Sequence, residues 1–443
     1  MDYNVFEYGA KGDGITKDTG AIQAAINKCY ANGGGRVVLP GGKTYLSGSI
    51  ILKSNVNLHI EQGAVLKASE DLADFRAIAE RNQGVSQVKR KEDVPSYINS
   101  EYNGEPFHYF IYAKKEENIS ITGAGAIDGS EAVFHGPGGQ YHREGLFYPR
   151  IPMFLLEDIA HLTIKNITMK KCAFWTLHMV GCYDVLVDGI RILNSLKMAN
   201  SDGIDPDHCK NVRIVNCHIE CADDCIVFKN TKSFREYGAC ENILVSGCTL
   251  ISTSAAVKFG TESEDDFKNI VIENCNISKS NRGLSLQLRD GGNIENVQFS
   301  NINIETRRFS EEWWGRAEPI CITAIDRKEG VKAGKIKNIR FQNINCQSEN
   351  GIFISGSKDN YIEDICLENV KVTIAKTSKW PADSYDLRPC AGSGMIKRKI
   401  SGMYADFTKG LTLRNVTVEK KENMAEFIEN SYELKNVDGV KFS

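Results

Sequence analysis

The stretch Leu162-Thr163-Ile164-Lys165-Asn166-Ile167 is one copy of a short pattern that returns along the chain. Apolar and polar residues alternate in it, and an Asn or Gly stands before the last apolar residue, as in Val185-Leu186-Val187-Asp188-Gly189-Ile190. Further copies occupy residues 211–217 and 242–248 or are centred on Asn274, Asn301, Asn343, Asn369 and Asn415. Alternation with a period of two predicts short strands with one buried face.

The spacing of these copies decides between repeat folds. From one Asn or Gly to the next, the intervals are 23, 27, 31, 27, 27, 42, 26 and 46 residues. Strands too short to fold alone need neighbouring copies to bury their inner faces. A leucine-rich repeat would require a dense leucine pattern, and a propeller blade requires about 40 residues or more. The sequence therefore predicts an all-β parallel β-helix, with insertions near residues 305–335 and 375–405.

The recurring asparagines have a structural explanation. Each stands at a bend between strands, where Asn tolerates the left-handed conformation better than most residues. Stacked copies can also form hydrogen bonds to the copies above and below. We therefore assign no catalytic role to most of these asparagines.

The N-terminal part differs from the repeats. Residues 19–29 have helical spacing, with Asp18 or Thr19 as the N-cap and Gly33-Gly34-Gly35 as the stop. Such a helix shields the first open coil of a solenoid.

We expect a single domain over residues 1–443. It comprises the cap and first coils (1–70), loop-rich coils (70–150), regular coils (150–420) and a C-terminal end (421–443). Residues 70–108 and 130–150 are expected to be long loops, and long loops on one side of a rigid stack predict a cleft.

The composition is that of a soluble globular protein. Of the 443 residues, 42% are hydrophobic and 25% charged, and the net charge is −3. This balance gives no general attraction to nucleic acid or to an anionic membrane. No secretory signal is visible, so we expect a cytoplasmic protein, or a secreted or periplasmic one if a leader has been removed. The fourteen cysteines are expected to be buried thiols in a reducing compartment.

Three aspartates carry the most specific chemical signal. Asp202 lies in Asn200-Ser201-Asp202-Gly203 before one strand, and Asp223 and Asp224 open the corresponding strand 21 to 22 residues later. Because this separation is a little under one repeat, we expect the carboxylates on one face of adjacent coils. Their repulsion favours a protonated acid beside an ionised base, which glycoside hydrolysis requires. The alternatives are solvated turns or a calcium site.

With these motifs, the helix at residues 18–29 and Tyr8-Gly9-Ala10-Lys11-Gly12-Asp13-Gly14, the sequence resembles glycoside hydrolase family 28, the polygalacturonase family. The resemblance extends over nearly the whole chain. It implies a right-handed parallel β-helix and hydrolysis of pectic α-glycosidic bonds with inversion. It also implies that Asp223 is the general acid and that Asp202 and Asp224 hold and activate the water.

Two departures from the family pattern concern substrate binding. The usual Gly-His-Gly is replaced by residues 254–260, which contain no histidine, and the usual Arg-Ile-Lys by Leu284-Ser285-Leu286-Gln287-Leu288. The site that would grip a substrate carboxylate is therefore altered. We predict replacement contacts, each with a purely structural role as the alternative, from these residues: Trp175, His178, Lys229, Lys258, Glu262, Gln287, Trp313, Trp314 and Arg316.

The sequence therefore predicts an exo-acting glycoside hydrolase that trims pectic oligosaccharides and needs no cofactor or metal. Galacturonate, rhamnose and a decorated galacturonate are all compatible with the cleaved bond, and the oligomeric state stays open. One alternative is a polysaccharide lyase on the same fold, which would use calcium and an Arg or Lys base. The other is a non-catalytic carbohydrate-binding β-helix.

Overall fold

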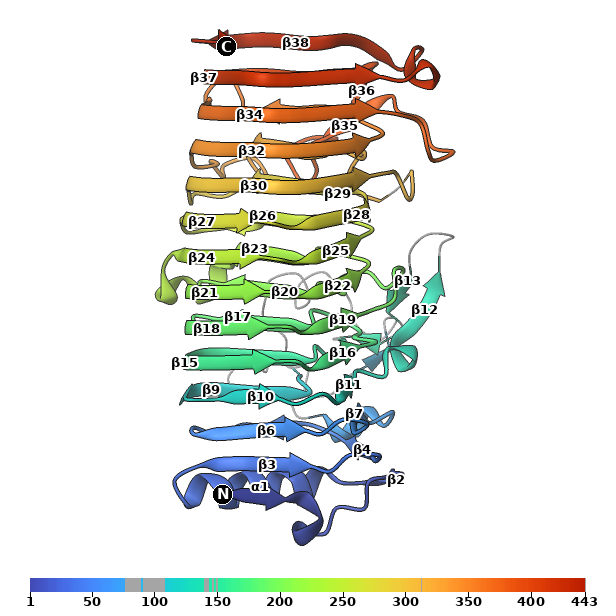
Figure 1. Ribbon diagram of the computed structural model, residues 1–443, viewed down its shortest axis with the longest axis vertical. Coiled ribbons are helices and arrows are strands. Elements are labelled where there is room, and N and C mark those ends of the chain that lie inside the picture. Colours follow the sequence, from blue (N-terminus) through green and yellow to red (C-terminus); the bar gives the residue numbers. More distant parts are fainter. Residues whose placement is uncertain are drawn as a thin grey trace. The chain divides into compact units, whose positions relative to one another are not determined.

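The computed structural model describes residues 1–75, 89–90, 108–138, 143–145, 147–148, 150–311 and 313–442. Short parallel strands, paired from one coil to the next, make up nearly all of its regular structure (Figure 1). The predicted all-β parallel β-helix is thus confirmed. The chain divides into two compact units, residues 1–222 and 223–443.

In the first unit the elements are β1 (Asp2–Asn4), β2 (Asp13–Lys17), α1 (Thr19–Ala31), β3 (Gly35–Leu39), β4 (Thr44–Ser47), β5 (Ile50–Ile51), β6 (Val56–Ile60), β7 (Val65–Ala68), β8 (Lys89–Arg90), β9 (Ile111–Glu117), β10 (Ser120–Thr122), β11 (Ala126–Asp128), β12 (His135–Gly138), β13 (Arg143–Gly145), β14 (Phe147–Tyr148), β15 (Phe154–Lys165), β16 (Thr168–Lys170), β17 (Leu177–Val180), β18 (Tyr183–Asp188), β19 (Arg191–Leu193), β20 (Ile204–Asp207), β21 (Lys210–Val215) and β22 (His218–Cys221).

In the second unit they are β23 (Ile226–Asn230), β24 (Cys240–Ser246), β25 (Thr249–Ser252), β26 (Ala255–Ser263), β27 (Phe267–Glu273), β28 (Asn276–Ser280), β29 (Arg282–Leu288), β30 (Ile294–Thr306), β31 (Ile320–Ala324), β32 (Ile336–Ser348), β33 (Ile352–Ser355), β34 (Ile362–Ile374), β35 (Ser384–Asp386), β36 (Met395–Lys397), β37 (Ile400–Lys420), β38 (Ile428–Asp438) and β39 (Lys441–Phe442).

Inward side chains stack in columns through each unit, because strands of successive coils pair in register. One column of the first unit consists of Leu58, Ile121, Ile164, Val187 and Ile214. The matching kind of column in the second unit consists of Ile270, Val297, Ile339, Ile365 and Leu411. All ten side chains are buried. Each coil therefore completes the apolar core of its neighbours, as a repeat of short strands requires.

The asparagines at the bends are left-handed, as predicted, with φ of 54° at Asn301 and 56° at Asn343. Their side chains form a ladder in which each Nδ2 donates to the Oδ1 of the preceding copy. The four hydrogen bonds run from Asn301 to Asn274 (3.2 Å), Asn343 to Asn301 (3.0 Å), Asn369 to Asn343 (3.0 Å) and Asn415 to Asn369 (2.9 Å). A second ladder, not anticipated from the sequence, joins Asn242, Asn269, Asn296 and Asn338.

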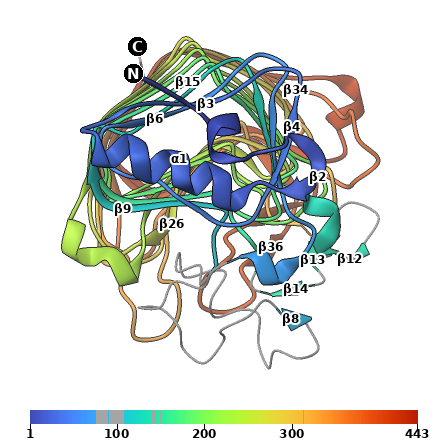
Figure 2. The ribbon, with the colours of Figure 1, turned by 90° about the horizontal axis from the view of Figure 1, so that it is seen from below.

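Helix α1 lies across the coils at the end of the first unit (Figure 2). Its buried side chains, Ile22, Ala25, Ile26 and Cys29, recur at helical spacing, and the helix packs against β3. Asp18 stands at the N-cap but does not cap the helix with its side chain. Its carboxylate instead accepts the amides of Lys11 (2.7 Å) and Gly12 (3.0 Å), which fixes the loop before the helix.

The predicted insertions differ in part from the structure. Residues 305–335 are not one loop, because β31 lies within them and pairs with β29 and β33. Residues 375–405 contain the β35–β36 hairpin and the start of β37. The expected loop at 70–108 lies largely outside the described residues, so the cleft stays a prediction. The described part of 130–150 is not one irregular loop, because it contains a 3-10 helix (Glu131–Phe134) and the antiparallel pair of β12 and β13.

None of the fourteen cysteines forms a disulfide, and twelve of them are buried, as the sequence predicts. Among the described residues, no helix has the length and apolar character needed to cross a membrane.

Candidate active site

Asp202 lies on a turn before β20 that buried groups hold in place. Asn200 is left-handed in this turn, with φ of 57°. Arg150 donates to the Ala199 carbonyl at 2.6 Å and to Asn200 Oδ1 at 2.7 Å. The amide of Thr176 donates to the carbonyl of Asp202 at 3.0 Å. Asp202 itself is only 2% exposed, so its carboxylate has a fixed place on the coil.

Asp223 and Asp224 lie between β22 and β23. Asp224 is 1% exposed, whereas Asp223 is half-buried. One oxygen of Asp224, Oδ1, accepts the Ser254 hydroxyl (2.9 Å) and the Ala255 amide (3.1 Å). The other, Oδ2, accepts Lys258 Nζ at 2.7 Å. Donors on the following coil therefore fix both oxygens of Asp224.

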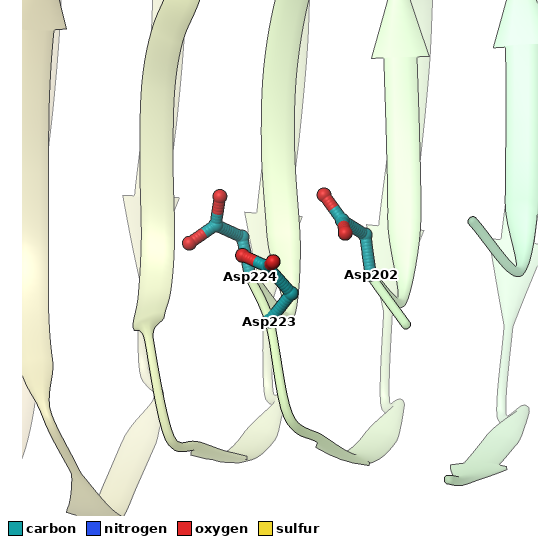
Figure 3. Close-up of side chains that lie close together, drawn as sticks. All are labelled: Asp202, Asp223 and Asp224. Carbon is teal, nitrogen blue, oxygen red and sulfur yellow. The ribbon is translucent and has the colours of Figure 1, made fainter. Parts of the chain in front are cut away.

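The three aspartates come together as the sequence analysis expects. Each offers a carboxylate oxygen, and these oxygens lie within 4.8 Å of one another (Figure 3). Three negative charges at this distance repel one another, and Lys258 offsets one of them. Such a group could also hold a cation, but the ammonium group of Lys258 already occupies one side of Asp224. The arrangement suits proton transfer and activation of water.

Trp175 and His178, both predicted to contact substrate, are buried. Trp175 is 3% exposed and stacks on Phe174, with ring centroids 5.1 Å apart. His178 is fully buried, meets the Trp175 ring edge-on and lies with Nε2 3.1 Å from Asp207 Oδ2. These contacts favour the structural alternative, in which the two rings support the turns around them.

The predicted Lys229 and Glu262 form an ion pair with each other, whereas the predicted Lys258 pairs with Asp224. Lys229 Nζ lies 3.5 Å from Glu262 Oε2, and Arg327 binds Asp290 through Nε and Nη2, both at 2.7 Å. Burial by itself would raise the pKa of Glu262, but the charges of Lys229, Arg327 and Lys258 hold it below its usual range. Glu262 is therefore an anion that balances its cationic neighbours.

Gln287 lies on β29, one coil beyond Lys258. Its neighbour on the same strand, Ser285, is the register partner of Lys258. Gln287 is 1% exposed and Ser285 fully buried. Among the described residues, Gln287 Nε2 and Ser285 Oγ have no hydrogen-bond partner. The strand thus presents uncharged, covered groups, and a sugar contact from Gln287 stays a prediction.

Trp313, Trp314 and Arg316 lie on the loop before β31, as expected. Trp314 is 42% exposed, and Arg316 is buried. The guanidinium of Arg316 donates to the carbonyls of Trp313 (2.9 Å) and Gly315 (2.6 Å) and to Ser384 Oγ (3.2 Å). Burial lowers the pKa of Arg316 to about 10. Arg316 thus fastens its own loop to β35, which favours its structural alternative, while Trp314 is available at the surface.

Two residues that hold Asp224 and the turn of Asp202 are not predicted from the sequence. Ser254 stands 30 residues after Asp224, about one repeat, so the period itself could have identified it. Arg150 reaches the Asn200 turn across 50 residues of sequence. No local pattern indicates this contact.

The chain is similar to known sequences over most of its length. The family model of "Glycosyl hydrolases family 28" matches residues 94–384, and "Rhamnogalacturonase A/epimerase, pectate lyase-like" matches residues 3–102. A "Probable polygalacturonase" of Vitis vinifera is 25% identical over 391 residues, 85% of this chain and 75% of that protein. An "Endo-polygalacturonase" of Pectobacterium carotovorum subsp. carotovorum is 24% identical over 376 residues, 81% of this chain and 85% of that protein.

Solved structures show the same architecture. The family 28 exopolygalacturonase of Yersinia enterocolitica superposes with a TM-score of 0.72 at 19% identity, over 99% of this chain and 78% of that one. The exopolygalacturonase of Thermotoga maritima gives 0.64 at 20% identity, over 95% and 92%. These likenesses support the expected right-handed winding of the β-helix. Since the family model covers well over half of the sequence, including all three clustered aspartates, the chain belongs to glycosyl hydrolase family 28.

Proposed function

We propose that this family 28 hydrolase cleaves α-glycosidic bonds of pectic oligosaccharides from a chain end, with inversion. The observation that carries the proposal is the cluster of Asp202, Asp223 and Asp224, whose oxygens lie within 4.8 Å of one another. In the proposed reaction Asp223 protonates the leaving oxygen, and Asp202 with Asp224 activates the attacking water. Such a pairing of acid and base is what glycoside hydrolysis requires.

The surroundings of each aspartate support this division of roles. Asp224 receives three hydrogen-bond donors, which fix its orientation, as a group that positions the attacking water requires. Asp223 is the most exposed of the three, which suits a group that must reach the glycosidic oxygen.

The substrate class follows from the relatives. Several are named as polygalacturonases, and two structural neighbours are named as exopolygalacturonases. We extend their chemistry to this chain as hydrolysis of galacturonate-containing oligosaccharides, with a terminal residue as the expected product. Because Ser285 and Gln287 stand where the family usually has basic residues, the sugar on one side of the cleaved bond need not carry a carboxylate.

The test is a panel of pectic oligosaccharides, with products separated over time. We expect a terminal monosaccharide from the first time point. Asp223→Asn should lower kcat by about 100- to 10,000-fold, the usual range for a general acid. The matched control is Asp188→Asn, which removes a carboxylate paired with Lys165 at the surface (3.0 Å) and should keep full activity. Internal fragments from long polymers would contradict the exo mode, and an unsaturated product would indicate a lyase.

Proton NMR of the first-formed product tests the stereochemistry. Inverting enzymes typically separate their two carboxyl groups by about 6.5–9.5 Å, and retaining enzymes by about 5–5.5 Å. The 4.8 Å here is an upper limit on the distances between one chosen oxygen of each aspartate, and it is not a separation of whole carboxyl groups. Our expectation of inversion therefore rests on the family. We expect the β-anomer first, and the α-anomer would show retention.

A further inference from the structure

Lys258 is held tightly against Asp224 by the coils around it. Its Nζ lies 2.7 Å from Asp224 Oδ2, and Lys258 is only 9% exposed. On β26, Lys258 is the register partner of Val227 on one side and of Ser285 on the other, and both are fully buried. Because covered side chains flank the lysine, the ion pair has little freedom to rearrange.

The contacts of Asp224 all come from one short segment. Ser254 and Ala255 donate to Oδ1, and Lys258 donates to Oδ2. Hydrogen-bond donors of this kind bind the lone pairs of an ionised carboxylate. These donors take three of the four lone-pair positions of the carboxylate, and the remaining one, on Oδ2, can accept a hydrogen from the attacking water.

The other cations of this region have carboxylate partners of their own. Lys229 pairs with Glu262, and Arg327 binds Asp290 through two nitrogens. Lys258 is therefore the cation that contacts Asp224, and its positive charge is the one left to neutralise that carboxylate.

We propose that Lys258 is a positioning residue that fixes Asp224 as an oriented carboxylate for activating water. With Asp224 held in this form, Asp223 is the member of the pair that carries the proton. This inference rests on the proposed function and deepens it, and it gives Lys258 a different role from the substrate contact that the sequence predicts. Lys258 acts through Asp224 and does not need to touch the sugar.

The first test replaces Lys258 and measures kcat and KM separately on the best oligosaccharide of the panel. Lys258→Met should lower kcat by about 100-fold, the effect expected of a misplaced reacting group, with KM within about threefold. Lys258→Arg restores the charge and should recover at least about tenfold of the loss. A matched control is Lys376→Met, which removes another lysine paired with a buried carboxylate, that of Glu349 (3.7 Å), and should keep the parent kcat.

A double-mutant cycle then asks whether Lys258 acts through Asp224. In an Asp224→Asn background, Lys258→Met should change kcat by less than about threefold, and the shifts in Tm should be non-additive. Additive Tm shifts, or a higher KM with an unchanged kcat, would overturn the inference. The Tm cycle does not depend on activity. If it shows coupling while the parent protein cleaves no pectic substrate, the proposed function fails, and the positioning role fails with it.

Discussion

At the scale of single residues, Asp386 shows what keeps a carboxylate charged inside this protein. It is fully buried, yet Arg388 binds it through Nε (2.9 Å) and Nη2 (2.8 Å) and the amide of Gly315 donates to it at 2.9 Å. Burial by itself would raise the pKa of Asp386, but Arg388, Arg282 and the Gly315 amide lower it to about 2. The same residue thereby ties β35 to the loop that carries Trp314.

This shift predicts a pH-dependent loss of stability in Asp386→Asn. A carboxylate whose pKa is depressed in the folded protein stabilises it above the unfolded pKa, and the effect disappears as pH falls through the folded pKa. The depression corresponds to about 2 kcal/mol. Denaturant unfolding should therefore show a gap of about 2 kcal/mol between parent and variant near pH 6 that narrows steadily below about pH 4. An exposed control, Asp359→Asn, should show no gap, and a gap that persists near pH 2 would contradict the prediction.

At the scale of elements, the parts that repeat could be predicted and the parts that interrupt the repeat could not. Every coil needs a left-handed bend at the same place, so Asn301 and Asn343 reveal their role by spacing alone. Arg282 and Arg289, in contrast, bind carbonyls of Asp386 and Leu387, 104 and 98 residues away. No periodic pattern encodes contacts of that kind. The sequence therefore predicts that insertions exist, but not which side chains fasten them.

The asparagine ladder should be a measurable source of stability. Asn343 donates to Asn301 and accepts from Asn369, and its φ is 56°. Asn343→Ala loses both hydrogen bonds and places an alanine in the left-handed conformation, which alanine tolerates less well than Asn. The free energy of unfolding should therefore fall by about 2–3 kcal/mol. Asn343→Gly keeps the backbone conformation and should lose about 1 kcal/mol less than the alanine variant. Denaturant titration measures both, and equal losses for Ala and Gly would show that the bend is not strained.

At the scale of the whole molecule, the fold and the grouping of the three aspartates follow from one repeat length. Asp223 and Asp224 follow Asp202 by 21 and 22 residues, a little under one repeat. This separation can be counted along the sequence, and it predicts the grouping of the three carboxylates. The neighbours of Arg316 and Trp175 depend on how irregular segments cover the coils, which counting does not give. Predicted substrate contacts are accordingly the part of the site that the sequence describes least well.

The reactivity of the fourteen cysteines toward a thiol reagent reports how well the interiors of both units are covered. None forms a disulfide, and only Cys366 and Cys390 are half-buried while the other twelve are buried. Burial raises the pKa of the Cys172 and Cys321 thiols to about 11, and the thiolate is the reactive form. With a thiol reagent such as Ellman's, at most two groups should react within minutes in the native protein, and Cys366→Ser with Cys390→Ser should remove that phase. In denaturant without reductant all fourteen should react, because a stack built on apolar columns needs no covalent cross-link; a smaller number would reveal disulfides.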